Sequence, residues 1–199
     1  RPGRGRRIEP DCHFVLLSRD KIRGPLNMSR VRIETELGDI ELELFEQQAP
    51  ASTGYFLADV RAGRYDGSSF FRIVTLSNQS AERHRRIAVI QGGLRHERED
   101  LEPVIPHEST AMTGLRHLKG TVSLARFAPG AVYHSFFICL RDEPALDFGG
   151  ARHPDGQGFA AFGRVSAGFD VVQRVYARAE TAEHLKNEIA IRRATVIAA

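Results

Sequence analysis

Two runs of alternating apolar and charged residues, separated by two small turn-forming residues, constrain the fold of this chain most strongly. Over residues 31–37 every second position is apolar or Thr and the positions between are Arg or Glu, and the same alternation runs over 40–44. A period of two directs one face of each strand to a core and the other to solvent. Gly38-Asp39 suits the two-residue turn of a hairpin. We therefore expect an antiparallel β-hairpin with its turn at these two residues.

Short apolar runs farther along the chain predict six more strands. They cover residues 70–75, 87–91, 121–125, 135–141, 160–165 and 188–197. Only two segments have helical character. In the first, Pro50 suits the opening turn and Gly63 the stop; the second spans 169–177 and is amphipathic. The stretch 93–119 is expected to be an irregular loop.

So many short strands with only two helices are incompatible with a doubly wound sheet, in which strands and helices alternate. Strands that close on themselves leave no unpaired edge. The pattern therefore indicates a mainly β protein: a closed eight-stranded antiparallel β-barrel capped by two α-helices.

Positive charge gathers at the start of the chain. Residues 1–30 contain eight Lys and Arg against three Asp and Glu, whereas the remaining 169 residues contain 20 against 22. We expect a basic, disordered leader over 1–30 and a single domain over 31–199, since 199 residues are too few for two domains of ordinary size. Met28 resembles a translation start, which would make 1–27 upstream sequence. Nucleic-acid binding through this tail is the weaker alternative.

Cysteine and histidine usage argues against disulfides and metals. Cys12 and Cys139 form neither a disulfide framework nor a C-x-x-C pair, which favours a reducing compartment, the cytoplasm. We expect Cys139 to be a small buried apolar residue. The eight histidines have no metal-binding spacing, so no metal is expected. No run of eighteen apolar residues is present, so we expect no membrane span.

Arg72 is the strongest candidate for a functional residue. It lies inside the apolar run 70–74, where a cation either faces solvent or points into a cleft. Two other segments favour the cleft: 89–93, which carries Gln91, and 135–139, which carries Phe137. A cation, an amide and an aromatic floor together suit a twisted proline peptide bond.

Six segments in a fixed order resemble the cyclophilins, a family of peptidyl-prolyl cis-trans isomerases. Beyond the opening hairpin, the resemblance rests on residues 65–72 (YDGSSFFR), 90–93 (IQGG), 117–125 (HLKGTVSLA), 135–138 (SFFI), 146–147 (LD) and 161–165 (AFGRV). It covers residues 31–177. The glycine-rich stretch 149–159 is more similar to bacterial members than to eukaryotic ones.

The resemblance implies a cofactor-independent isomerase acting on X-Pro bonds. It assigns Arg72 as the catalytic arginine, Gln91 as the amide that contacts the substrate backbone and Phe137 as the floor of the proline pocket. The implied substrate-binding residues are Val89, Ala125, Arg126, Leu146 and Phe159. The implied partners are proline-containing peptides and unfolded or flexible protein chains, whose folding the enzyme would assist. We expect a monomer.

Several positions depart from the family pattern. Ala88 replaces an aromatic residue, Ser135 a glutamine and Ala145 a Trp or Phe, and Phe159 stands in place of a histidine or tyrosine. These changes leave the cation intact but remove polar groups and part of the pocket wall. The alternative function is therefore a low-activity module that binds proline-containing segments.

Overall fold

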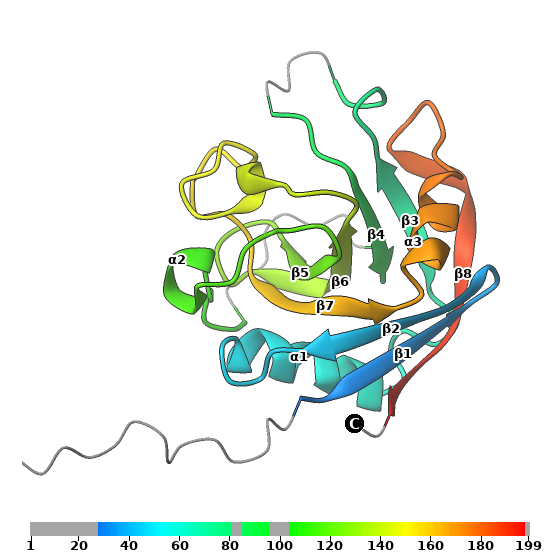
Figure 1. Cartoon of the computed structure of the whole chain (residues 1–199), viewed down its shortest axis with the longest axis horizontal. Coiled ribbons are helices and arrows are strands. Elements are labelled where there is room, and N and C mark those ends of the chain that lie inside the picture. Colours follow the sequence, from blue (N-terminus) through cyan, green and yellow to red (C-terminus); the bar gives the residue numbers. More distant parts are fainter. Residues whose placement is uncertain (1–27, 81–84, 96–103, 198–199) are drawn as a thin grey trace, which may run out of the picture.

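The computed structural model describes residues 28–80, 85–95 and 104–197 (Figure 1). Eight strands form one closed antiparallel barrel in the order β1-β2-β7-β5-β6-β4-β3-β8, and β8 pairs back onto β1. The expected closed eight-stranded barrel is confirmed. The expected leader lies outside the described residues up to residue 27, and β1 already begins at Arg30.

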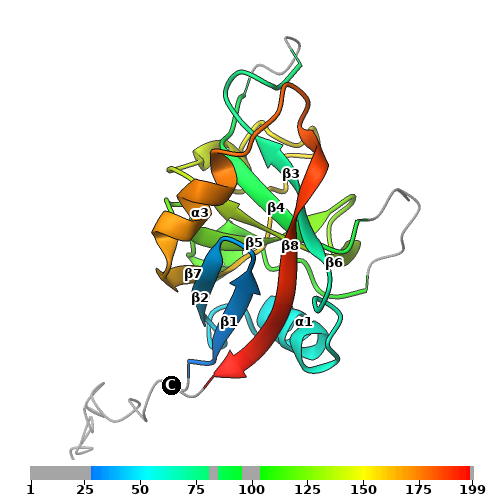
Figure 2. The ribbon, with the colours of Figure 1, turned by 90° about the vertical axis from the view of Figure 1, so that its right-hand side faces the viewer.

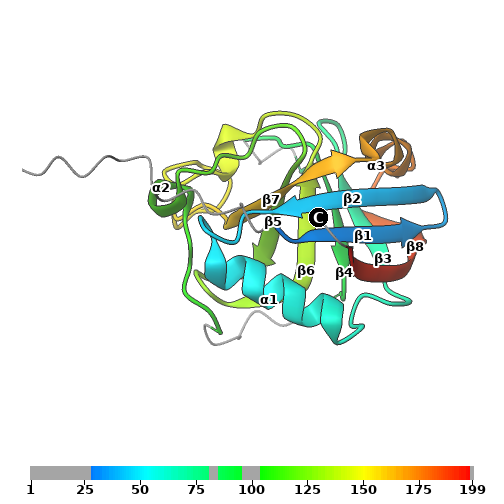
Figure 3. The same ribbon diagram turned by 60° about the horizontal axis from the view of Figure 1, so that its bottom comes forward.

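Each expected strand and helix is present. The strands are β1 (Arg30–Thr35), β2 (Gly38–Leu44), β3 (Ser69–Val74), β4 (Val89–Gly93), β5 (Thr121–Arg126), β6 (Val132–Cys139), β7 (Ala161–Ala167) and β8 (His184–Ile197). The helices are α1 (Pro50–Arg61), α2 (Thr110–Thr113) and α3 (Phe169–Tyr176), with a 3-10 turn at Pro144–Leu146. Helices α1 and α3 lie on opposite sides of the barrel (Figures 2 and 3).

The four-residue helix α2 was not expected, because one turn is too short to produce a helical period. It lies within the stretch that the sequence indicated to be irregular. None of the helices in the three described ranges is both long enough and apolar enough to cross a bilayer.

The first hairpin forms as expected, but the prediction of its turn was wrong by two residues. Thr35 pairs with Gly38, so Glu36 and Leu37 make the turn. The Thr35 hydroxyl stabilises it, because its Oγ1 accepts a hydrogen bond from the Leu37 amide at 3.0 Å and donates one to the Gly38 carbonyl at 2.7 Å. Gly38, with φ of +123°, opens β2 in a conformation that favours glycine.

Aromatic rings fill the barrel core. Phe56 of α1 lies with its ring centroid 5.0 to 5.4 Å from those of Tyr65, Phe136 and Phe162. Phe70 of β3 meets Phe136 edge to face at 6.0 Å. All five side chains are at most 1 % exposed, so they anchor α1 against the inside of the barrel.

A second, smaller apolar cluster lies apart from this core. Its buried members are Val74, Ile87, Val89, Ala125, Phe137, Cys139 and Leu146. Phe137 belongs to it while its neighbour Phe136 belongs to the barrel core, since successive strand residues point to opposite faces. Cys139 is fully buried, as expected, and burial raises the pKa of its thiol.

Two strands begin earlier than the sequence suggested. β6 starts at Val132, three residues ahead of its expected first residue, so Tyr133 is part of the strand. β8 starts at His184, four residues ahead, and its fourteen residues pair with both β1 and β3. The residue before this strand, Glu183, is thereby fixed beside β3, where its carbonyl accepts a hydrogen bond from Ile73 N at 2.8 Å.

Candidate active site

One cavity of about 280 Å³ brings together all eight residues that the sequence indicated for the site. These are Arg72, Val89, Gln91, Ala125, Arg126, Phe137, Leu146 and Phe159. Five residues that the sequence did not indicate also line it: Ile87, Phe127, Tyr133, Arg152 and His153. A larger hollow of about 510 Å³ lies elsewhere, and its lining is mostly charged and polar and has no aromatic ring.

The floor of the cavity is apolar. Phe137 is 5 % exposed and meets the ring of Phe159 edge to face, with centroids 5.5 Å apart and an interplanar angle of 88°. Val89 and Leu146 are buried beside them. These side chains come from β6, β4, the 3-10 turn and the segment before β7, so the floor exists only in the closed barrel.

Arg72 reaches the cavity because β3 is bulged. In the pairing with β4 the register shifts between Phe70 and Arg72, which leaves Phe71 as the extra residue. The pairing with β8 is irregular at the same place, but there the additional residues lie on β8. Phe71 stacks on the ring of His184 at 6.2 Å, outside the cavity lining. A bulge turns the side chain that follows it to the other face of the strand. The side chain of Arg72 therefore lines the cavity, although most other residues of β3 are buried and apolar.

Three hydrogen bonds hold the Arg72 guanidinium. Its Nη1 donates to Gln91 Oε1 at 2.9 Å. Its Nε donates to Glu183 Oε2 at 3.0 Å, and its Nη2 forms an ion pair with the same oxygen. The side chain is 24 % exposed, so a cation is held at the cavity edge by groups from β4 and from the segment that leads into β8.

Gln91 connects the cation to a buried polar network. It lies directly opposite Arg72 in the ladder between β3 and β4. While its Oε1 accepts from Arg72, its Nε2 donates to Tyr133 Oη at 3.2 Å and to Ser135 Oγ at 3.1 Å. The Ser135 hydroxyl donates onward to the Gly92 carbonyl at 3.0 Å. Gln91 is 4 % exposed, so these contacts orient its amide.

Tyr133 was missed because its strand was expected to begin only at residue 135. On β6, Tyr133, Ser135 and Phe137 alternate, so an earlier strand start would have placed all three on the cavity face. Burial raises the pKa of Tyr133, and the hydrogen bond with Gln91 and the charge of Arg72 oppose that shift in part. The phenol therefore stays neutral near pH 7.

Arg126 lines the cavity, but its polar atoms hold the glycine-rich loop. Nη1 and Nη2 bind the two carboxylate oxygens of Asp155 at 2.8 and 2.9 Å, and Nε donates to the Gly158 carbonyl at 2.7 Å. The guanidinium also lies over the Phe159 ring at 4.9 Å. Burial alone raises the pKa of Asp155, but the hydrogen bonds from Arg126 and from the Gln157 amide outweigh it, so this pKa lies below its usual range.

Gly158 allows Phe159 to approach the 3-10 turn. The Phe159 amide donates to the Leu146 carbonyl at 2.9 Å. Gly158 has φ of +66°, and a Cβ there would lie 2.6 to 2.7 Å from the backbone of Leu146 and Asp147. Only glycine satisfies both conditions.

Arg152 joins two loops at the rim of the cavity. Its Nη1 donates to Gln79 Oε1 at 2.6 Å and to the Arg85 carbonyl at 3.2 Å. Gln79 is buried and donates through Nε2 to the carbonyls of Thr75 and Ile87. The segment between β3 and β4, to which Gln79 and Arg85 belong, is therefore fastened to the glycine-rich stretch 149–159. Neither residue has a sequence signal, since both lie in loops without a period.

The site does not resemble a metal centre. Within residues 28–80, 85–95 and 104–197, no group of three or more His, Cys, Asp or Glu side chains could hold a metal ion. The arrangement offers instead a fixed cation, a fixed amide and a buried apolar floor. Such a site can bind an uncharged group and hydrogen-bond to it without proton transfer.

Comparison with known proteins identifies similar chains. Residues 30–196 match the family described as "Cyclophilin type peptidyl-prolyl cis-trans isomerase/CLD". A peptidyl-prolyl cis-trans isomerase, cyp18, of Streptomyces antibioticus is 34 % identical over 149 residues, which cover 74 % of this chain and 83 % of the relative. Peptidyl-prolyl cis-trans isomerase B of Escherichia coli strain K12 is 29 % identical over 146 residues, covering 73 % and 82 %.

The fold is similar to a solved structure as well. The crystal structure of a Cryptosporidium parvum cyclophilin type peptidyl-prolyl cis-trans isomerase matches with a TM-score of 0.62 and 20 % identity, covering 86 % of this chain and 99 % of that one. A second crystal structure of that protein, in the presence of the dipeptide Ala-Pro, matches with a TM-score of 0.61 and 21 % identity, covering 85 % and 99 %.

Proposed function

Because this chain belongs to the cyclophilin-type peptidyl-prolyl cis-trans isomerase family, we propose that the cavity built on Arg72, Gln91 and Phe137 is its isomerase active site. Isomerisation about X-Pro bonds is the activity of the family and needs no cofactor. The observation that carries the proposal is the hydrogen bond from Arg72 to Gln91 at the edge of the floor made by Phe137.

Isomerisation of a prolyl bond requires an apolar binding site and one hydrogen-bond donor. A prolyl peptide bond rotates over a barrier of about 18–20 kcal/mol, set by amide resonance. Twisting removes the resonance, so the nitrogen regains a lone pair and the carbonyl loses charge separation. A less charge-separated transition state is favoured away from water. The floor of Phe137, Leu146 and Phe159 provides such surroundings.

Arg72 can donate a hydrogen bond to the revived lone pair. That bond is available only in the twisted state, so it lowers the barrier and does not merely tighten binding. A bond to a charged group contributes roughly 1.5–3 kcal/mol, whereas a 10⁵-fold acceleration needs about 7 kcal/mol. Removal from water, and backbone anchoring by Gln91 and the Ala125 strand, must supply the rest.

The partners we propose are proline-containing segments of unfolded or flexible chains, and the physiological role is assistance to folding. The support is the apolar floor of the cavity of about 280 Å³, which lies beside a fixed guanidinium. We propose that the enzyme acts as a monomer in the cytoplasm, in keeping with its cysteine usage and the buried thiol of Cys139.

The test is cis/trans exchange measured by NMR on an Ala-Pro peptide, with and without protein. We expect exchange cross-peaks with the wild type, and a rate roughly 10- to 100-fold lower with Arg72→Ala, because about 1.4 kcal/mol corresponds to tenfold. Arg164→Ala is the control, since Arg164 pairs with Glu43 on the outside of the barrel and should leave the rate unchanged.

An undiminished rate in Arg72→Ala would remove Arg72 from the mechanism. Saturable peptide binding by the wild type without exchange would identify the alternative, a module that holds proline-containing segments. Ala88, Ser135 and Ala145 motivate that alternative, since they stand where the family pattern has two aromatic residues and a glutamine.

A further inference from the structure

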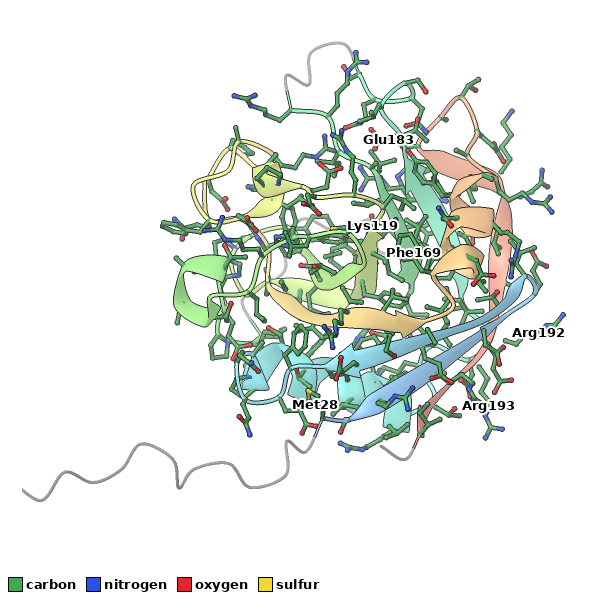
Figure 4. All side chains as sticks on the ribbon, viewed as in Figure 1. Met28, Lys119, Phe169, Glu183, Arg192 and Arg193 are labelled. Carbon is green, nitrogen blue, oxygen red and sulfur yellow. The ribbon has the colours of Figure 1, made fainter. Side chains whose placement is uncertain are left out.

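Glu183 holds the cation of the proposed active site from outside the cavity. It is not among the residues that line the cavity, yet one of its carboxylate oxygens accepts from both Nε and Nη2 of Arg72. Figure 4 labels Glu183, in the segment that connects α3 to β8, beside β3. The carboxylate is 17 % exposed, so solvent screens the pair only in part.

The backbone around Glu183 is fixed to the strand that carries Arg72. The Glu183 carbonyl accepts from Ile73 N at 2.8 Å. The Asn78 side-chain amide donates to the Ile73 carbonyl at 2.9 Å and to the carbonyls of Glu180 and Ala182 at 3.2 and 3.3 Å. The backbone of this segment is therefore held against β3 at Glu183 and just before it, which fixes the point from which the carboxylate reaches Arg72.

Glu183 and Gln91 together restrict Arg72 to one orientation. Of the five N–H groups of a guanidinium, two are engaged by Glu183 and one by Gln91, each on a different nitrogen. Because these contacts reach all three guanidinium nitrogens, they fix both the position and the tilt of the planar group. The two remaining N–H groups, one on each terminal nitrogen, are thereby fixed in direction and can donate to a substrate atom.

We propose that Glu183 is a positioning residue for Arg72, an inference that rests on the proposed isomerase function. Its carboxylate holds the guanidinium where it donates to the prolyl nitrogen of the twisted bond, so no reorganisation is needed as the bond rotates. An arginine without this anchor would distribute among several rotamers. Glu183 does not touch the substrate.

Two physical effects of the carboxylate oppose each other. Orientation favours catalysis, whereas the negative charge reduces the net charge of the donor. Removing Glu183 tells which effect is larger. A lower kcat means that orientation dominates, and a higher kcat means that charge reduction dominates. Our inference requires the first outcome, because Gln91 alone binds only one of the three guanidinium nitrogens.

The experiment compares Glu183→Ala, Glu183→Gln and the wild type in the proline-exchange assay. We expect kcat to fall about tenfold in Glu183→Ala with KM within about twofold, since the cavity lining is intact. Glu183→Gln retains a carbonyl oxygen that can accept from Arg72, so it should recover part of the loss. An unchanged or raised kcat in Glu183→Ala would overturn the inference.

Glu43→Gln is the matched control. Glu43 accepts from Arg164 Nε on the barrel exterior, and its side chain is 13 % exposed, close to the value for Glu183. It lines no part of the cavity. If loss of any half-buried ion pair slowed the enzyme through general destabilisation, this variant would slow it equally. We expect wild-type kcat, and an equal loss would contradict the positioning role.

A second readout separates this inference from the proposed function. In the nitrogen-15 spectrum of the wild type, the Arg72 Nε–H signal, identified by its absence in Arg72→Lys, should exchange slowly with water. Exchange should be at least tenfold faster in Glu183→Ala. A wild type without isomerase activity but with this protection would refute the proposed function alone. Equal rates of Arg72 Nε–H exchange in the wild type and in Glu183→Ala would refute the positioning role of Glu183, whatever the isomerase activity.

Discussion

The ring of His117 lies parallel to the ring of Phe137, with centroids 6.0 Å apart and an interplanar angle of 14°. The His117 side chain is fully buried, and its Nδ1 is 2.7 Å from Asp147 Oδ1 while its Nε2 is 3.1 Å from Ser123 Oγ. Since a carboxylate only accepts, Nδ1 carries the proton in this pair. The pocket floor thus rests on a hydrogen-bonded ring whose orientation is fixed from both ends.

The two adjacent phenylalanines of β6 should separate activity from stability. Phe137→Leu should lower kcat/KM about tenfold while changing the free energy of unfolding by less than about 1.5 kcal/mol, because it reshapes the cavity and not the barrel core. Phe136→Leu should destabilise by about 1–3 kcal/mol with nearly normal kcat/KM, since Phe136 packs on the three core rings of Phe56, Tyr65 and Phe70. Urea unfolding and the exchange assay measure both, and the reverse pattern would contradict the assignment.

The Asp147 carboxylate should stabilise the fold above about pH 4. Burial raises its pKa, but hydrogen bonds from the side chain and amide of His117 outweigh this, so its pKa lies below the usual value of 3.8. A group whose pKa is lowered in the folded state stabilises above its unfolded pKa, and that stabilisation is lost as pH falls through the folded pKa. Between pH 5 and pH 3, the free energy of unfolding should therefore fall less in Asp147→Asn than in the wild type.

This pH dependence is read from urea midpoints of the two proteins at each pH. The difference between wild type and Asp147→Asn should be largest above pH 4.5 and shrink as the carboxylate is protonated. A difference that stays constant with pH would mean that His117 contributes no charge-dependent stabilisation through Asp147.

Loss of the Asp155 carboxylate should loosen the glycine-rich loop. The side chain of Arg126 is 1 % exposed. In Asp155→Ala its guanidinium would keep the Gly158 carbonyl as its main hydrogen-bond partner. An unsatisfied buried donor costs about 1–3 kcal/mol. We expect the free energy of unfolding to fall by this amount. We also expect KM to rise, because Arg126 lies over the ring of Phe159. Asp170→Ala, which removes an exposed pair with Arg174, is the control and should change neither quantity.

Removal of the Arg152 side chain should loosen the segment between β3 and β4, to which Gln79 and Arg85 belong. The hydrogen bonds from Arg152 to Gln79 and to the Arg85 carbonyl join that segment to the glycine-rich stretch 149–159. In Arg152→Ala, limited trypsin digestion should cut after Arg85 or Arg86 several-fold faster than in the wild type. A cleavage rate equal to that of the wild type would show that the other bonds of Gln79 suffice.

The barrel and the strand residues that line the site, such as Arg72 and Phe137, were predictable because they lie in period-two patterns. The hairpin, the strand with Arg72 and the strand with Phe137 can each be predicted from their own residues. The resemblance to the family then predicted that Arg72 and Phe137 line the same site. The hairpin turn was misplaced because Gly38-Asp39 is a strong turn signal, whereas the Thr35 hydroxyl stabilises a turn two residues earlier. Side-chain capping of this kind has no sequence signature.

Contacts between distant segments could not be predicted. Glu183 is 111 positions from Arg72 and lies in a polar stretch that indicates only a loop. Arg152 and Gln79, 73 positions apart, each lie in a loop without a period. Closure of the barrel decides which of these loops meet, and a linear pattern of propensities contains no information on that closure.

The fourteen residues of β8 bridge β1, the first strand, and β3 (Figure 1). A nascent chain from which β8 has not yet emerged therefore presents seven strands with two open edges. Such edges readily pair with other chains, and long-range pairings form slowly. Biogenesis of this enzyme should depend on the interval between the emergence of β7 and that of β8 from the ribosome, which makes the enzyme itself a candidate client for chaperones.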